Sequence, residues 1–223
     1  MKLRPYQRDA CVQAWDALQT QRSCLIVAPT GAGKTVMGRS FVESWVANDP
    51  TRNPVYFGVH RRELAAQSKK ALAGIPRVKV FSVQGICAQF RKQRHHAYAQ
   101  PSLVVLDEAH HYMAAQWREP LQYWAKASIL GLTATPERAD GKPLGDIFGS
   151  LVVSTTYPTL IDEGYLVPVR VLRGRQRDGT AQARDPVEAY AAHTPSEKGF
   201  GLCRNKKEAR KLDEALTAAG VTA

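Results

Sequence analysis

The sequence predicts an α/β protein built on a parallel sheet that is flanked by helices. Short apolar runs alternate along the chain with segments whose apolar residues recur at helical spacing. Two runs, 103–106 and 129–132, are apolar throughout, which is typical of strands buried on both faces of a sheet. Strands that alternate with helices favour parallel pairing through right-handed crossovers. Ligands of such sheets gather at the carboxyl ends of the strands, so residues that directly follow a strand are the first candidates for a site.

The expected strands are short, and most are rich in β-branched residues. They are placed at 24–27, 55–59, 78–83, 103–106, 129–132, 151–153 and 164–169. The expected helices lie at about 5–18, 34–46, 84–98, around Leu160 and at 206–218, with one more opening after His60. Pro5 suits the first position of a helix, and the run from Asn48 to Pro50 is a stop signal for the second helix.

The last part of the chain differs in composition from the rest. Residues 174–184 are rich in Arg, Gln, Gly and Asp and have no apolar periodicity, which indicates a linker. One strand at 199–203 and one helix after it cannot bury a core of their own. We therefore expect a first domain at 1–172, a linker at 173–196 and the start of an incomplete second domain at 197–223.

The composition is typical of a globular protein. Of the 223 residues, 44% are apolar and 23% are charged, which argues against disorder. No apolar stretch approaches the roughly 20 residues needed to cross a bilayer, and the polar N-terminus has no signal-peptide core. The four cysteines are widely separated and have no metal-like spacing. We expect buried, reduced cysteines, a cytoplasmic location and no membrane partner.

The chain is strongly basic. Its net charge of +11 suits a polyanionic partner such as nucleic acid, although a basic solvated surface explains the charge alone equally well. The cationic cluster at 91–96 is interpreted as a solvated helix end, because no ligand pattern surrounds its adjacent histidines.

The segment 28–35 has the pattern of a phosphate-binding loop. It lies between an apolar run and a helical pattern, the context that such a loop needs, although Ala28 stands where the usual pattern has glycine. Glycines allow the backbone N–H groups to turn inward around a polyphosphate, and the helix dipole favours the same anion. Lys34 can reach the β- and γ-phosphates, and the Thr35 hydroxyl can coordinate Mg²⁺. The alternative is an ordinary glycine-rich turn between a strand and a helix.

An acidic pair follows the fourth strand. Asp107 can hold the Mg²⁺ of a nucleotide, directly or through water, and Glu108 can orient the attacking water and accept its proton. Alternatively, the pair caps the next helix through the dipole effect. Because Lys34, Arg61, Asp107 and Thr133 all lie just past predicted strand ends, one edge of the sheet is expected to hold them.

Several segments resemble a known family in the order in which they occur. Three segments resemble motifs I, II and III of the superfamily 2 helicases in their DEAH-box form; in that order, they are Ala28–Thr35, Asp107–His110 and Leu132–Pro136. Three more segments resemble elements of the same family. Leu3–Gln7 resembles the adenine-recognising element, Val59–Gln67 resembles motif Ia, and Ser82–Gln84 resembles the next strand-contact segment. The resemblance covers about residues 3–172 and implies a RecA-like P-loop NTPase. The tail resembles the first strand and helix of the second RecA-like domain of the family.

The resemblance also implies a role for each matching residue. ATP would contact Arg4, Gln7, Pro29, Thr30, Gly31, Ala32, Gly33, Lys34 and Thr35, with adenine held by Gln7 and Arg4. Catalysis would involve Lys34, Asp107 and Glu108, with Mg²⁺ on Thr35 and Asp107. Coupling of hydrolysis to domain movement would fall to His110, Thr133 and Thr135, although His110 could also be a plain helix-start residue. Nucleic-acid phosphates would contact His60, Arg61 and Gln84, without reading the base sequence.

The departure from the family is the missing part of the second domain. That domain carries arginines that reach the γ-phosphate, and an arginine finger is worth roughly 10³–10⁵ in rate in GTPases. We expect this chain alone to bind ATP·Mg²⁺ weakly, to hydrolyse it very slowly and not to unwind a duplex. A fragment of a longer helicase or a truncated product is expected, with the second RecA-like domain supplied in cis or in trans.

Two other functions fit the same residues less completely. One is a non-catalytic nucleic-acid-binding or remnant module, against which the intact Lys34, Asp107 and Glu108 argue. The other is a restriction-type or repair translocase that moves duplex without separating its strands. The family resemblance favours DNA over RNA, because the DEAH histidine together with the segment 3–7 looks like DNA repair, restriction and phage members.

Overall fold

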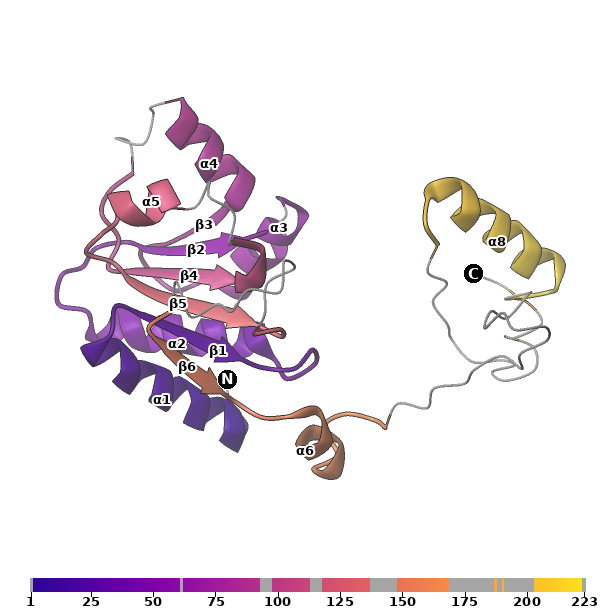
Figure 1. The fold of residues 1–223 in the computed structure, drawn as a ribbon, viewed down its shortest axis with the longest axis horizontal. Coiled ribbons are helices and arrows are strands. Elements are labelled where there is room, and N and C mark those ends of the chain that lie inside the picture. The colour runs from indigo at the N-terminus through magenta and orange to yellow at the C-terminus, as the bar shows by residue number, and fades with distance from the viewer. Residues whose placement is uncertain are drawn as a thin grey trace. The chain divides into compact units, whose positions relative to one another are not determined.

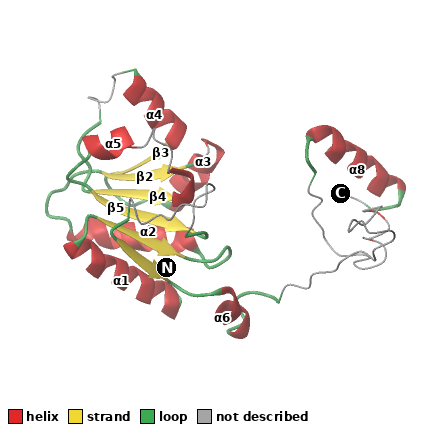
Figure 2. Cartoon of the chain, viewed as in Figure 1, coloured by secondary structure: helices red, strands yellow, loops and turns green. Residues whose placement is uncertain are grey.

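A computed structural model describes residues 2–60, 62–92, 98–112, 118–136, 148–168, 187, 190 and 203–221. The chain divides into two compact units, Met1–Val167 and Pro168–Ala223, and each is described by itself. The first unit holds the sheet, and within the second the described residues form one helix (Figures 1 and 2).

The sheet of the first unit is parallel and six-stranded, in the order β3-β2-β4-β5-β1-β6. Its strands are β1 (Ser23–Val27), β2 (Val55–Val59), β3 (Val78–Ser82), β4 (Leu103–Asp107), β5 (Ser128–Thr133) and β6 (Ser150–Val153). β4 and β5 lie between β2 and β1. The carboxyl ends of β1, β5 and β4 are therefore neighbours at one edge of the sheet. The predicted α/β class with a parallel sheet is confirmed.

Helices cover both faces of the sheet, as Figure 1 shows. They are α1 (Pro5–Thr20), α2 (Lys34–Asn48), α3 (Arg62–Ala71), α4 (Val83–Arg91), the 3₁₀ helix η2 (Ala109–Tyr112), α5 (Arg118–Tyr123) and α6 (Tyr157–Asp162). α1 packs on β1 and β6, α2 packs on β4 and β5, and α3 packs on β2 and β3. Side chains of α4 lie in the cluster on the other face.

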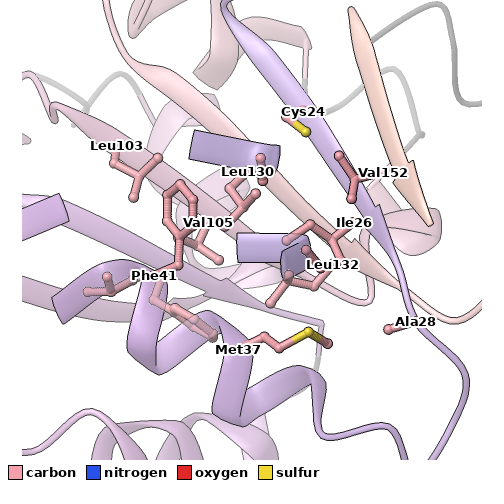
Figure 3. Close-up of a cluster of buried hydrophobic side chains, with 14 of the residues drawn as sticks. Cys24, Ile26, Ala28, Met37, Phe41, Leu103, Val105, Leu130, Leu132 and Val152 are labelled. Carbon is pink, nitrogen blue, oxygen red and sulfur yellow. The ribbon is translucent and has the colours of Figure 1, made fainter. Parts of the chain in front are cut away.

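The core consists of two clusters, one on each face. Figure 3 shows the first, in which Met37 and Phe41 of α2 point toward Ile26, Leu130 and Leu132 of the central strands. The second cluster is centred on Trp124, which is fully buried and whose ring lies 5.0 Å from that of Tyr56, centroid to centroid. Because the central strands contribute side chains to both clusters, they are apolar along their whole length.

Two expected elements differ from the structure. No strand forms over the described part of 164–169, because the N–H groups of Tyr165 and Leu166 both donate to the Leu160 carbonyl and close the end of α6. Gly164, with φ of 72°, makes this turn. The helix expected at 84–98 ends at Arg91, where the N–H of Lys92 still donates to the Ala88 carbonyl.

The described part of the second unit is α8 (Lys206–Ala218). Its N-cap is Asn205, whose side chain accepts the Glu208 N–H at 2.9 Å, while Glu208 accepts the Arg204 N–H at 3.1 Å. Most of the strand expected at 199–203, and the linker apart from Val187 and Tyr190, lie outside the described residues. The boundaries 1–172, 173–196 and 197–223 therefore stay a prediction. Among the helices of the described residues, none is both long and apolar enough to span a membrane.

Candidate functional site

The segment Ala28–Thr35 connects the buried strand β1 to the first turn of α2. Gly31 and Gly33 have φ angles of 87° and 83°, a left-handed backbone that glycine adopts without a Cβ penalty. Gly33 is the N-cap of α2, and among the described residues no side chain caps this helix start. The first N–H groups of α2 are therefore available to an anion, which the helix dipole also favours.

Tyr6 and Gln7 brace this loop from α1. Gln7 Nε2 and the Tyr6 hydroxyl both donate to the Ala32 carbonyl, at 2.8 and 2.9 Å. The Gln7 side chain is buried, and its Oε1 accepts the Arg4 N–H at 3.0 Å. Both ends of the Gln7 amide are thus engaged within the protein. Arg4 lies over the ring of Tyr165, 4.1 Å from the centroid.

The Lys34 side chain lies beside the acidic pair at the carboxyl-terminal edge of the sheet. Its Nζ lies 3.5 Å from Glu108 Oε1, and the Lys34 side chain is only 10% exposed. β1 and β4 each pair with β5, so residues 73 and 74 positions apart in sequence reach the same place. Glu108 has a φ of 53°, a conformation that costs a non-glycine residue of the order of 1–3 kcal/mol and that is concentrated at functional sites.

Asp107 ends β4 in a partly buried position. Burial, together with the adjacent Glu108 carboxylate, raises the pKa of Asp107 from 3.8 to about 6. The Glu108 N–H, which donates to Asp107 Oδ1 at 3.1 Å, and the Lys34 ammonium oppose this rise only in part. The two carboxyl groups are therefore held together at an electrostatic cost that a bound cation would relieve.

His110 connects the acidic pair to the end of β5. Its Nδ1 lies 2.9 Å from the Thr133 hydroxyl and 3.5 Å from Glu108 Oε2. Thr133 is fully buried, and its hydroxyl donates to the Thr135 carbonyl at 2.9 Å and accepts the Thr135 N–H at 3.2 Å. The Thr135 side chain is exposed, and its connection to this network is through its backbone. The three residues predicted to couple hydrolysis to movement are thus one hydrogen-bonded group.

The predicted nucleic-acid contacts are only partly described. His60 follows β2, and its ring stacks on that of His111 at 4.0 Å between centroids; the ring of His111 lies 4.0 Å from that of His110. A row of imidazoles therefore runs from the end of β2 to the acidic pair. Gln84 is exposed in the first turn of α4, whereas Arg61 lies outside the described residues.

Sequence reasoning missed a second set of residues at this edge, on the segment from α6 to Leu166. The Tyr157 hydroxyl accepts the Thr30 N–H at 3.1 Å. A Cβ on Gly31 would lie 2.8 Å from Leu166 Cδ2, so the leucine packs directly on the loop. The signal in the sequence is an aromatic residue shortly after a strand at the ligand-binding edge, and it is weak because such residues are usually core.

The oxygen donors present fit one Mg²⁺ ion held together with nucleotide phosphates. The Thr35 hydroxyl and the Asp107 carboxylate are the hard oxygen ligands that this ion prefers. Among the described residues no group of three or more His, Cys, Asp or Glu side chains could hold a metal alone. This agrees with the usual coordination of Mg²⁺, in which one or two carboxylates bind the ion and phosphate and water complete its shell.

A family model matches most of the first unit. The family described as "Type III restriction enzyme, res subunit" matches residues 1–79 and 73–138.

Curated relatives share the same part of the chain. The "Putative mitochondrial ATP-dependent helicase irc3" of Schizosaccharomyces pombe is 28% identical over 77% of this chain, which spans 32% of that protein. The "Type I restriction enzyme EcoAI endonuclease subunit" of Escherichia coli is 27% identical over 76% of this chain, which spans 24% of that protein. The chain thus corresponds to about a quarter to a third of the length of these two relatives.

Solved structures share the fold. The UvsW helicase from bacteriophage T4 matches with a TM-score of 0.56 and 15% identity, covering 69% of this chain and 60% of that one. These values establish a common RecA-like α/β fold.

Proposed function

This chain belongs to the family described as type III restriction enzyme res subunits, and on that premise we propose that it carries the first motor domain of an ATP-dependent DNA helicase or translocase. The family and its helicase relatives confirm the resemblance to superfamily 2 helicases as ATP-hydrolysing enzymes. The DEAH subtype, the DNA preference and the cytoplasmic location remain proposals that rest on the sequence.

One observation carries the assignment: Lys34 Nζ lies 3.5 Å from Glu108 Oε1, beside the Asp107 carboxyl. A phosphate-loop lysine and an acidic pair on opposite sides of the sheet would have contradicted the motor interpretation. Their meeting at one edge supports a shared site for a nucleoside triphosphate and its cation.

Each residue in this site has a proposed task. The Lys34 ammonium and the N–H groups of the loop hold the β- and γ-phosphates, and Thr35 and Asp107 provide oxygen ligands for Mg²⁺. Mg²⁺, when bound, would neutralise charge that develops on the phosphates. Glu108 orients the attacking water and accepts its proton once Lys34 has turned to the phosphates.

Through its hydrogen bond to Thr133, His110 would transmit a change at the nucleotide site to the end of β5. Nucleic acid would bind along the ends of β2 and β3, through His60, Arg61 and Gln84. The net charge of +11 supports binding of a polyanion, without deciding between DNA and RNA. ATP turnover at motor rates would need a second RecA-like domain, because nothing in the described site supplies an arginine to the γ-phosphate.

The proposal is tested by comparing the chain with a Lys34→Ala variant and a Glu108→Gln variant. We expect the chain to bind a fluorescent ATP analogue in a Mg²⁺-dependent manner, Lys34→Ala to bind it weakly, and Glu108→Gln to bind it well but to lose the slow hydrolysis. Nucleic-acid binding that is unaffected by ATP and by Lys34→Ala would favour the non-catalytic binding module instead.

A duplex translocase of the restriction type is the second candidate, favoured by the match to the restriction enzyme subunit EcoAI. The two candidates differ in what the complete motor does to a duplex. A translocase displaces a third strand from a triplex without separating the duplex, whereas a helicase releases a labelled single strand. Both assays use the chain together with a second RecA-like domain, supplied in cis or in trans.

A further inference from the structure

A tyrosine from a distant part of the chain hydrogen-bonds a backbone N–H of the phosphate loop. The Thr30 N–H, which lies in the loop between β1 and α2, donates to the Tyr157 hydroxyl at 3.1 Å. Tyr157 lies 127 positions further along the chain, at the first residue of α6. The residue is 49% exposed, so burial does not explain the position of its side chain. The hydrogen bond holds a half-exposed aromatic residue against the loop.

The segment that follows Tyr157 is anchored to the core and to the loop. Leu160 of α6 is fully buried in the first core cluster, and Leu166 packs against Gly31. The ring of Tyr165 lies 5.8 Å from that of Tyr6, between centroids, and Tyr6 itself hydrogen-bonds the loop at Ala32. The Tyr157 hydroxyl is therefore presented to the loop by a packed turn, which keeps the entropic cost of this contact small.

The electrostatic surroundings of the hydroxyl are those of an anion site. The pKa of Tyr157 lies below its usual value because its oxygen accepts hydrogen bonds from Thr30, and the Lys34 ammonium acts in the same direction. The oxygen thus occupies a position where partial negative charge is favoured.

We propose that the Tyr157 hydroxyl stands in for a phosphate oxygen of the nucleotide and that nucleotide binding displaces it from Thr30. A backbone N–H has one proton to donate, and a hydrogen bond to an ionised phosphate is roughly twice as strong as one to a neutral hydroxyl. The phosphate therefore accepts the Thr30 N–H in place of the Tyr157 hydroxyl. Tyr157 is released, and the hydrogen bond that joins the start of α6 to the loop is lost. This inference rests on the proposed nucleotide site and adds a residue that opposes binding there.

The test removes the hydroxyl and keeps the ring. In Tyr157→Phe the competing hydrogen bond is lost, so the chain binds a fluorescent ATP analogue about 2- to 10-fold more tightly, which is the range for one net hydrogen bond. Tyr98→Phe is the control, because it makes the same change on the opposite face of the sheet, where Tyr98 packs against the second core cluster. Affinity in Tyr157→Phe that equals or falls below that of the unmodified chain overturns the inference.

A second measurement follows the hydrogen bond directly. The Thr30 amide proton, followed by NMR, exchanges faster in Tyr157→Phe than in the unmodified chain when no nucleotide is present. With saturating nucleotide the two proteins exchange alike, because phosphate protects the amide in both. A difference that persists in the bound state overturns the inference. Absence of nucleotide binding in both proteins contradicts the proposed function itself, whereas equal binding in both contradicts only the role of Tyr157.

Discussion

The two halves of the candidate site are built in different ways. The phosphate-loop half, Ala28–Thr35, is held by hydrogen bonds from neutral groups, with the Ala32 carbonyl accepting from both Tyr6 and Gln7. The acidic half at the end of β4 is held by charged groups in poor solvation, and there the pKa of Asp107 rises to about 6. The loop is thus held by contacts within the protein, whereas the acidic pair is at an electrostatic disadvantage that a bound cation would relieve.

This difference predicts how substitutions in each half of the site change the stability of the folded chain and its affinity for a ligand. A loop that is already formed costs little to organise when phosphate binds. A partly buried carboxyl beside another carboxylate destabilises the folded chain, and a divalent cation would reverse the sign of that interaction. We therefore expect substitutions in the loop half to lower both stability and binding, and some substitutions in the acidic half to raise stability while they abolish function.

The largest effect is expected from Gly33→Ala. A Cβ at this position would lie 2.5 Å from Gln7 Nε2, on a backbone with φ of 83°. Left-handed strain and overpacking together should lower the free energy of unfolding by about 2–4 kcal/mol and disrupt nucleotide binding. Gly74→Ala is the matched control, because Gly74 has φ of 86° but no heavy atom within 4 Å of the added Cβ. Urea unfolding that gives the same loss for both variants would show that the contact with Gln7 is unimportant.

Lys34→Ala should weaken binding of a nucleotide analogue by about 10- to 100-fold, since a hydrogen bond to a charged group contributes roughly 1.5–3 kcal/mol. Removing the ammonium also removes one of the groups that lower the pKa of Asp107, so that carboxyl should titrate at a higher pH in the variant. Lys126→Ala removes the same charge from an exposed position before β5. Fluorescence titration should show no change in affinity for Lys126→Ala, and a similar loss in both variants would indicate only a general charge effect.

Asp107→Asn should stabilise the folded chain by up to about 3 kcal/mol at pH 7.5, the free energy of a pKa shift from 3.8 to about 6. The folded-state pKa is raised, so the penalty is absent below the unfolded pKa, grows as pH rises and is complete above the folded pKa. The advantage of Asp107→Asn in thermal unfolding should therefore shrink from pH 7.5 to pH ~4. Nucleotide binding of the unmodified chain should become less dependent on Mg²⁺ below pH ~6, where this carboxyl is protonated.

Asp49 provides the control of opposite sign. Burial tends to raise its pKa, but hydrogen bonds from Thr51 and Ser102 and the Arg77 charge outweigh this, so the pKa lies below its usual value. Asp49→Asn should therefore destabilise the chain at neutral pH, and this loss should disappear as pH falls through the folded-state pKa of Asp49. Destabilisation by both substitutions at pH 7.5 would contradict the electrostatic distinction between the two carboxyl groups.

The smallest expected effect is that of Thr133→Val. Valine keeps the shape of this buried residue but removes the hydroxyl that joins His110 to the Thr135 backbone, at a cost of about 1–2 kcal/mol in unfolding free energy. Thr135→Val should change stability by less than about 0.5 kcal/mol, because its side chain is exposed and only its backbone joins the network. Chemical denaturation of the two variants measures the difference, and equal values would exclude a structural role for the Thr133 hydroxyl.

The local features of the fold were predictable from short stretches of sequence. The strand expected at 55–59 and the helix expected at 206–218 have these same limits in the structure. Glycines in a loop between an apolar strand and a helix predicted the geometry of Gly31 and Gly33, because positive φ is a local property. The strand expected at 164–169 was wrong because the chain after α6 uses its N–H groups to close that helix, which no alternation of residues reveals.

The sequence by itself determined the α/β class, the phosphate-loop pattern and the presence of an acidic pair after a buried strand, since each depends on neighbouring residues. Only the tertiary structure decided that Gln7 braces the loop, that Tyr157 occupies the Thr30 N–H and that Asp107 has a raised pKa. These features join residues from 25 to 127 positions apart or depend on burial, so they arise when the strands take their order and the helices pack. The pattern of a short segment cannot contain them, because hydrogen bonding and desolvation at one residue are set by side chains that arrive from elsewhere in the chain.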